Sequence, residues 1–180
     1  MKKRMEQTVL VLTACTGLFG GIAFHEGGGI WLSLFITAAV TLYYFAVRLL
    51  IGEVYDRMLG NHADWRKRWF QPFSWEEGLY RRLRVKRWKD RMPVFAPSAF
   101  VLKKHSFSEV LGAMCQAELV HETAAVCSFL PLLLVRSAGA FPVFFLTSLA
   151  AALFDLSFAV MQRYNRPRVL RLMEGENRKR

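Results

Sequence analysis

The sequence contains little cysteine and little histidine, which limits the metal and redox chemistry that it indicates. Three cysteines occur in 180 residues, at Cys15, Cys115 and Cys127. No two of them form a CxxC pair, so neither a disulfide framework nor a cysteine zinc site is indicated. Of the four histidines, His25 is followed by Glu26 but lacks the second histidine of the HExxH zinc motif. We therefore interpret His25 as an exposed turn residue.

Acidic residues are also scarce, with 14 Asp and Glu against 25 Lys and Arg, for a formal net charge of +11. Such a balance can indicate nucleic-acid binding, so the placement of the basic residues decides the interpretation. They precede the first hydrophobic block, fill the middle of the chain and follow the last block. The short connections at 25–29 and 136–140 contain one Lys or Arg residue between them, Arg136. The positive-inside rule then predicts a multi-pass protein of the cell membrane with both termini cytoplasmic, and no nucleic-acid partner.

Few charges interrupt four hydrophobic blocks, at residues 9–24, 30–51, 110–135 and 141–161. Each block is close to the roughly 20 residues that a membrane-spanning helix needs. We expect an all-α, polytopic membrane protein whose single integral domain covers residues 1–180 and contacts the lipid bilayer. The LTAC sequence ending at Cys15 is similar to a lipoprotein cleavage site. The apolar run before it is too short for a signal peptide, so the first helix is expected to be uncleaved.

The long segment between the second and third blocks, residues 52–109, alternates aromatic and basic side chains. This pattern is typical of amphipathic helices in the plane of the lipid headgroups, so we expect a cytoplasmic interfacial segment. Residues 106–109 (SFSE) match a capping box, which predicts that the third long helix begins near Phe107. Residues 163–180 form a basic tail, expected in the cytoplasm.

Ionisable residues occur inside the third and fourth blocks. Glu118, His121 and Glu122 share one face of a helix, and the His121 side chain should tilt back toward Glu118. Asp155 lies at a similar depth in the fourth block. Ionisable residues within a membrane indicate a functional site by default. The alternatives are a helix start whose charges lie among headgroups, and an Asp155 that only stabilises the bundle by pairing with Arg48 or a hydroxyl.

Three sequence blocks carry a family resemblance: residues 85–90 (VKRWKD) with Pro93, 117–121 (AELVH) and 162–168 (QRYNRPR). Their order and spacing resemble the glycosyl-4,4'-diaponeurosporenoate acyltransferase family, over about residues 65–172. The resemblance implies transfer of a fatty acyl group onto a sugar hydroxyl of a glycosylated carotenoid acid at the cytoplasmic membrane.

Three positions depart from the family pattern. Glu122 replaces the family's usual Trp, residues 155–157 (DLS) replace an Asn-x-Pro, and Val94 stands where Asp-Gly often follows the proline.

Acyl transfer assigns roles to these polar residues. Neutral His121 would accept the proton of the attacking hydroxyl while Glu118 holds its tautomer. Asn165 and Tyr164 could donate to the carbonyl oxygen as negative charge develops. Arginines at 163, 166 and 168 would hold the phosphates of an anionic donor, either acyl-CoA or a phospholipid. The expected catalytic residues are His121, Glu118, Asp155 and Asn165, and the expected substrate-binding residues are Arg163, Tyr164, Arg166, Arg168, Trp88, Lys89 and Glu122.

Other interpretations use the same residues. The Glu118-x-x-His121 pair is half of a carboxylate metal motif, so Glu122 and Asp155 could complete the ligands of a metal-dependent intramembrane hydrolase or oxidoreductase. Cys115 could carry an acyl intermediate, although neighbouring carboxylates would raise the pKa of its thiol. A third interpretation is a non-enzymatic membrane scaffold. The acyl-transfer interpretation needs no metal or cofactor, and its partners are the donor and a glycosylated lipid acceptor; the oligomeric state stays open.

Overall fold

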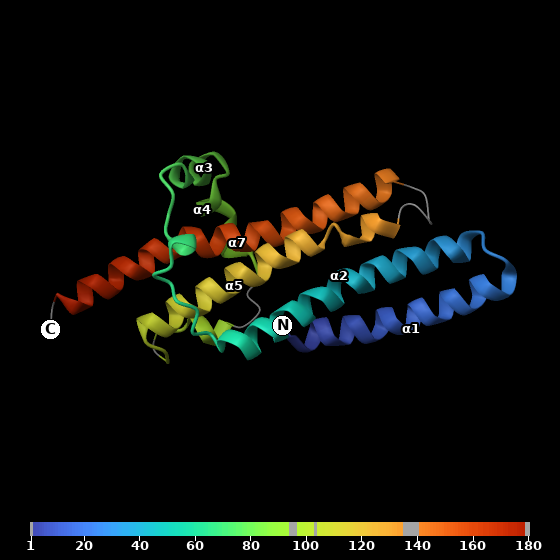
Figure 1. Ribbon diagram of the computed structural model, residues 1–180, viewed down its shortest axis with the longest axis horizontal. Coiled ribbons are helices and arrows are strands. Elements are labelled where there is room, and N and C mark those ends of the chain that lie inside the picture. The colour runs from blue at the N-terminus through green and yellow to red at the C-terminus, as the bar shows by residue number, and fades with distance from the viewer. Residues whose placement is uncertain (1, 94–96, 103, 135–140, 179–180) are drawn as a thin grey trace.

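A computed structural model describes residues 2–93, 97–102, 104–134 and 141–178, and all regular structure in these ranges is helical (Figure 1). The predicted all-α class is confirmed. Four long helices form the body: α1 (Lys2–Glu26), α2 (Ile30–Leu59), α5 (Phe107–Cys127) and α7 (Phe141–Asn177). The short helices are η1 (Arg68–Phe70), α3 (Glu76–Arg82), α4 (Val85–Trp88), η2 (Lys89–Arg91), η3 (Pro97–Phe100) and η4 (Leu130–Leu134).

The first two long helices form an antiparallel hairpin (Figure 1). Three consecutive glycines, Gly27, Gly28 and Gly29, connect them with φ values of 76°, 109° and 66°. Glycine adopts positive φ without steric penalty, so this sequence permits the tight reversal. Helix α2 packs against α5, and α5 packs against α7. The order of neighbours is therefore α1, α2, α5, α7, with α5 between the hairpin and the C-terminal helix.

Three helical stretches are long and apolar enough to cross a membrane: Lys3–Glu26, Ile30–Leu59 and Phe141–Glu176. The fourth predicted span, at 110–135, is not confirmed. Polar residues occupy the middle of α5, and the α-helix ends at Cys127 instead of continuing to 135. The predicted external turn at 136–140 lies outside the described residues, as does Val94.

Two helices extend beyond their predicted ends. Helix α2 continues from 51 to Leu59, so the expected interfacial segment begins as part of this helix. Helix α7 continues through Pro167 to Asn177, so most of the basic tail belongs to it. At about 1.5 Å per residue, its 37 residues measure roughly 55 Å, more than the roughly 30 Å of a hydrocarbon core. If α7 crosses a membrane upright, part of the helix therefore lies outside the hydrocarbon core.

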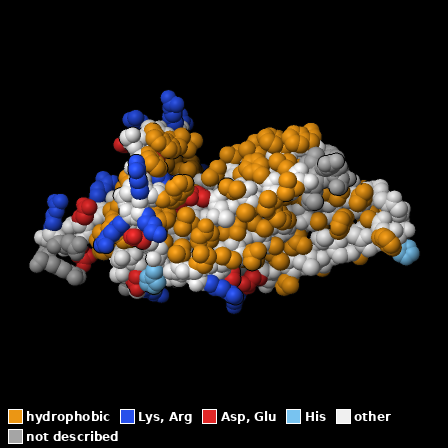
Figure 2. Space-filling model, viewed as in Figure 1, with side chains coloured by type: hydrophobic (Ala, Val, Ile, Leu, Met, Phe, Trp, Pro, Cys, Tyr) orange, Lys and Arg blue, Asp and Glu red, His pale blue; other side chains and the backbone are white. Residues whose placement is uncertain are grey.

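Side chains are distributed unevenly along the molecule. Figure 2 shows hydrophobic side chains over the long helices, whereas Lys and Arg gather toward the end that holds α3, α4 and the C-terminus. Large apolar side chains are left in contact with the surroundings, including Phe24, Leu133 and Leu146, which are 92%, 77% and 63% exposed. Apolar surface of this extent favours contact with lipid over contact with water.

Helix α5 begins where the capping box predicts. The Ser106 Oγ accepts a hydrogen bond from the Glu109 backbone N–H at 3.3 Å, and the Ser106 backbone N–H donates to Glu109 Oε2 at 2.7 Å. These hydrogen bonds to Ser106 stabilise the ionised carboxylate and hold the pKa of Glu109 below its ordinary value. The predicted helix start is confirmed.

The turn after α2 lies directly against α5. Asn61 has a φ of 64°, and its backbone N–H donates to the buried Gln116 side chain at 2.7 Å. A Cβ atom added at Gly112 would overlap the carbonyl oxygen of Asn61. Gly112 therefore permits the close approach that brings the segment following α2 onto α5.

The substitution Gly112→Ala tests this contact. We expect it to destabilise the protein by about 1–3 kcal/mol, because the extra methyl group forces α5 and the turn apart. Gly21→Ala in α1 is the matched control, since nothing lies within 4 Å of its added Cβ. The control should be neutral or slightly stabilising. Thermal unfolding in detergent, followed by circular dichroism, measures both, and equal midpoints for the two variants would contradict the contact.

Candidate active site

Two fully buried acidic residues lie on the facing helices α5 and α7. Glu118 and Asp155 both have 0% of their surface exposed. An unpaired buried charge costs several kcal/mol, so the partners of these carboxylates determine what the interface can do. Each carboxylate is paired with arginine, and the two pairs form separate polar clusters.

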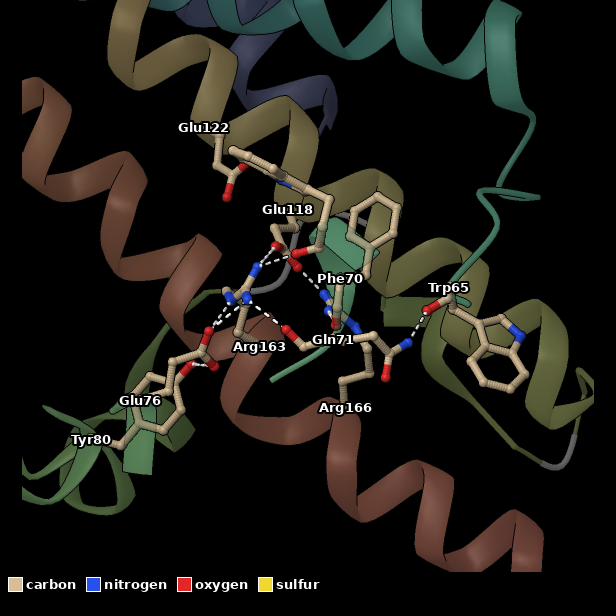
Figure 3. A network of polar contacts seen from close by, with 10 residues as sticks. Trp65, Phe70, Gln71, Glu76, Tyr80, Glu118, Glu122, Arg163 and Arg166 are labelled. Carbon is tan, nitrogen blue, oxygen red and sulfur yellow. Dashed lines mark hydrogen bonds and ion pairs between the residues drawn. The ribbon is translucent and has the colours of Figure 1, made fainter. Parts of the chain in front are cut away.

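The first cluster consists of Glu76, Glu118, Arg163 and Arg166, and we call it the arginine–glutamate cluster (Figure 3). Glu118 accepts hydrogen bonds from Arg163 Nη1 at 2.5 Å and from Arg166 Nη2. Arg163 also donates to Glu76 Oε1 from Nε at 3.0 Å and from Nη2 at 2.5 Å. Two carboxylates thus balance two guanidinium groups, and the cluster is neutral within itself.

The same arginines hold the loop that contains η1. Arg163 donates to the carbonyl oxygens of Trp69 at 2.9 Å and Gln71 at 3.1 Å, and Arg166 donates to that of Phe70 at 2.5 Å. Carbonyl groups outside regular helices need donors from elsewhere, and the planar fork of arginine supplies several from one side chain. Helix α7 therefore fixes the position of residues 69–71.

Helix α3 is attached through the same cluster. Glu76 lies in its first turn and is only 4% exposed. Tyr80 donates to Glu76 Oε2 at 2.6 Å, and its ring packs edge-to-face on Tyr164 of α7. Burial, followed by the hydrogen bond with Glu76, raises the pKa of Tyr80. The tyrosine therefore stays protonated and serves as a donor.

The second cluster joins α2, α5 and α7 through Asp155. His121 Nδ1 lies 3.2 Å from Asp155 Oδ1, and Arg48 donates to Oδ2 from Nε at 2.9 Å and from Nη2 at 2.6 Å. The imidazole stacks on Phe158 with 4.6 Å between ring centroids. An ionised carboxylate can only accept, so Nδ1 carries a proton in this contact, and in the neutral imidazole Nε2 then keeps a lone pair. The His121 side chain is 21% exposed, which leaves part of it open to a substrate.

The predicted partnership of Glu118 with His121 is wrong. Both oxygens of Glu118 bind arginines of α7, and Asp155 holds the imidazole instead. Charge-assisted bonds from guanidinium groups are about twice as strong as neutral ones, which favours arginine over a neutral imidazole at Glu118. Asp155 also pairs with Arg48, which is the contact that the bundle-stabilising alternative predicted. The same carboxylate contacts His121 as well.

The predicted anion-binding arginines differ in their surroundings. Arg163 and Arg166 are partnered by carboxylates and backbone carbonyls, so they are not free cations. Arg168 is exposed, and its guanidinium lies 4.2 Å from the Tyr164 ring centroid and donates to the Tyr164 hydroxyl at 2.6 Å. Asn165 is half-buried on the same helix. The substrate-binding and catalytic roles of these residues stay predictions.

Trp88 and Lys89 are two further candidates for substrate binding. The polar contacts described for them are with residues close to them in the sequence. Trp88 donates to the Leu83 carbonyl at 3.0 Å, and Lys89 pairs with Asp90 at 2.6 Å. No contact joins them to His121 within the described ranges. Their part in substrate binding stays a prediction.

The predicted metal ligands do not come together. Glu118 binds arginines, and Glu122 accepts a hydrogen bond from Trp69 Nε1 at 3.0 Å. Only His121 and Asp155 of the four are in contact, and the described part of the chain has no group of three His, Cys, Asp or Glu residues arranged to hold a metal ion. The predicted four-residue ligand set is therefore wrong.

Cys115 belongs to the core. It is fully buried and packs with Ala63 and Phe70. A thiol without exposed surface cannot reach an acyl donor, so the covalent-intermediate interpretation loses its support.

The sequence interpretation missed Glu76, Tyr80 and Trp69. Glu76 carried a signal, because it is an acidic residue at a helix start within a strongly basic segment. The roles of Tyr80 and Trp69 depend on contacts with α5 and α7, which no local pattern indicates.

Comparison with protein families places the chain beside known proteins. A family model described as glycosyl-4,4'-diaponeurosporenoate acyltransferase matches residues 66–175, which is more than half of the chain. The matched range contains the arginine–glutamate cluster together with His121 and Asp155, but not Arg48. No curated protein and no solved structure matches the chain.

Adjacent glutamates provide a test of the cluster. We expect Glu76→Gln to destabilise the protein by about 3–5 kcal/mol, because it leaves Arg163 under-compensated in a buried site. The neighbouring Glu77 is exposed, so Glu77→Gln should change the free energy of unfolding by no more than about 0.5 kcal/mol. Chemical denaturation in mixed micelles compares the two. Similar losses in both variants would show that the Glu76 ion pair does not stabilise the fold.

Proposed function

The chain belongs to the glycosyl-4,4'-diaponeurosporenoate acyltransferase family, and we propose that it esterifies a hydroxyl of a lipid-linked or carotenoid-linked sugar with a fatty acyl group. The family supplies the reaction class. The observation that carries the proposal for this chain is the contact of His121 Nδ1 with the buried Asp155 carboxylate, within the matched range. That contact leaves Nε2 available to a substrate hydroxyl.

The reaction follows from that arrangement. The sugar hydroxyl oxygen attacks the carbonyl carbon of the acyl donor, a new C–O bond forms, and the hydroxyl proton passes to His121 Nε2. The bond from the carbonyl carbon to the leaving group then breaks, and the imidazolium returns the proton to the leaving thiolate or alkoxide. Asp155 stabilises the imidazolium through Nδ1, as the aspartate does in a Ser-His-Asp triad.

Arg48 is a positioning residue in this proposal. Besides its bonds to Asp155, it donates from Nη1 to the Tyr44 carbonyl at 2.9 Å, which fixes the guanidinium on α2. Its guanidinium lies against the fully buried Asp155 carboxylate. The ion pair therefore holds this carboxylate in position to contact His121.

The depth of the pair suits an amphiphilic acceptor. Counting from Phe141, Asp155 lies about 21 Å along α7, within the roughly 30 Å of a hydrocarbon core and toward the end where basic residues gather. We propose that this end is cytoplasmic, in line with the positive-inside pattern. Apolar chains would then approach from the bilayer, while the sugar enters toward His121 from the cytoplasmic headgroup side.

The donor is an acyl-CoA or a phospholipid, both of which carry phosphate. Arg168 is the candidate for binding it, because the described contacts of this exposed guanidinium are with the Tyr164 ring and hydroxyl. Asn165 remains the proposed donor to the developing oxyanion.

Substitution of the proposed base tests the function. Full-length protein in liposomes receives glycosyl-4,4'-diaponeurosporenoate with either acyl-CoA or phospholipid donor, and mass spectrometry measures the ester. We expect His121→Ala to lower the rate by about 10²- to 10⁴-fold, because a positioned base contributes that much. Asp155→Asn should also lower it.

The matched control is His25→Ala, since His25 is exposed at the end of α1. This variant should keep the wild-type rate. A folded His121→Ala protein with full activity would contradict the proposed base. Absence of ester from the wild-type protein with both donors would favour the scaffold alternative.

A further inference from the structure

A groove of about 270 Å³ lies between the end of α2, the η1 loop and α5. Its lining includes Leu59, Asp64, Lys67, Trp69, Leu119 and Glu122. Glu122 follows His121 in the chain, so the groove lies at the same level along α5 as the proposed base. The charged side chains that line the groove are Asp64, Lys67 and Glu122. The four side chains of the arginine–glutamate cluster do not line it.

Trp69 forms an exposed aromatic wall that is held at two points. Its indole Nε1 donates to Glu122 at 3.0 Å, and its carbonyl accepts from Arg163 at 2.9 Å. The residue is nevertheless 59% exposed. An indole ring fixed in this way offers a flat apolar face to a ligand at little cost in conformational entropy.

The polar lining selects against an anionic ligand. Two carboxylates, Asp64 and Glu122, face one ammonium group, Lys67, so the lining has a net negative charge. Phosphate groups would be repelled, and the arginine-rich helix α7 offers them a better position. Carboxylates accept hydrogen bonds from hydroxyl groups, and an ammonium group donates to hydroxyl oxygens.

A pyranose ring matches both features. Its axial C–H bonds form an apolar face that can stack on an indole, and its hydroxyl groups around the edge can bind carboxylates. The groove volume is slightly below the range of about 300–1,000 Å³ that is typical of drug-sized ligands. One sugar ring therefore fits better than a lipid chain or a nucleotide.

We propose that this groove binds the sugar ring of the acyl acceptor, with Trp69 as the stacking platform and with Asp64 and Glu122 as hydroxyl acceptors. The assignment rests on the proposed function, because a groove at the level of His121 along α5 matters for the reaction only if the bound sugar is acylated. Glu122 has a second role here, because its carboxylate also fixes Trp69 of the η1 loop.

Binding can be measured without catalysis. Saturation-transfer NMR with methyl β-D-glucopyranoside uses the full chain in lipid nanodiscs. The expected result is a signal from wild type that Trp69→Ala reduces by roughly three- to tenfold, which corresponds to the loss of one aromatic contact. Trp75→Ala is the matched control, because Trp75 is 61% exposed and stacks on Phe73 instead of lining the groove. The control should keep the signal.

Asp64→Asn provides a second variant that does not depend on the Trp69 contacts. Asp64 is exposed, and its carboxylate accepts one hydrogen bond among the described contacts, from the Arg66 backbone N–H nearby in the chain, so the fold should survive. We expect weaker glucoside binding and a raised KM for the glycosylated acceptor, with the KM for the donor unchanged. An unchanged glucoside signal in both folded variants would overturn the groove assignment, as would a signal from phosphocholine but none from the glucoside.

The two proposals fail in different ways. Glucoside binding that depends on Trp69, without ester formation by wild type, would support the groove and reject the acyltransferase function. Ester formation that is insensitive to Trp69 and Asp64 would leave the function standing and reject the groove.

Discussion

The buried carboxylate of Glu118, held between Arg163 and Arg166, is the interaction on which the rest of the structure depends. A charge with no exposed surface needs compensation, and here two guanidinium groups on α7 supply it. Because arginine has five donors, the same groups also bind Glu76 and three backbone carbonyls of the η1 loop. One ion-pair cluster thus joins α5, α7, α3 and the loop between α2 and α3.

This arrangement separates two tasks that the sequence interpretation had combined. The arginine–glutamate cluster fixes the loop that carries Trp69, and the cluster around Asp155 orients the imidazole of His121. Helix α2 contributes Arg48 to the second cluster and Leu59 to the groove, although it precedes the residues that match the family model. Helix α2 is therefore part of the proposed site and is also long and apolar enough to cross a membrane.

The sequence predicted the features that depend on local patterns. Hydrophobic length predicted the helices around Ile30 and Phe141, and the capping box predicted the start of α5. The common level of His121 and Asp155 was also predictable, because a constant rise per residue converts sequence position into depth. The partner of Glu118 was not, since periodicity identifies neighbours on one helix but not which residues of another helix face it. The length of α7 beyond Pro167 was missed because a basic, proline-containing tail indicates the end of a helix.

A double-mutant cycle between Glu118 and Arg166 tests the central interaction most directly. The free energy of unfolding is measured for wild type, Glu118→Gln, Arg166→Gln and the double variant, with the exposed pair Glu53 and Arg57 as a reference cycle. Compensation of the buried carboxylate by Arg166 predicts a coupling energy on the order of 3 kcal/mol, so the double variant should lose less stability than the sum of the two single losses. A coupling energy as small as that of an exposed pair, about 0.5 kcal/mol, would contradict it.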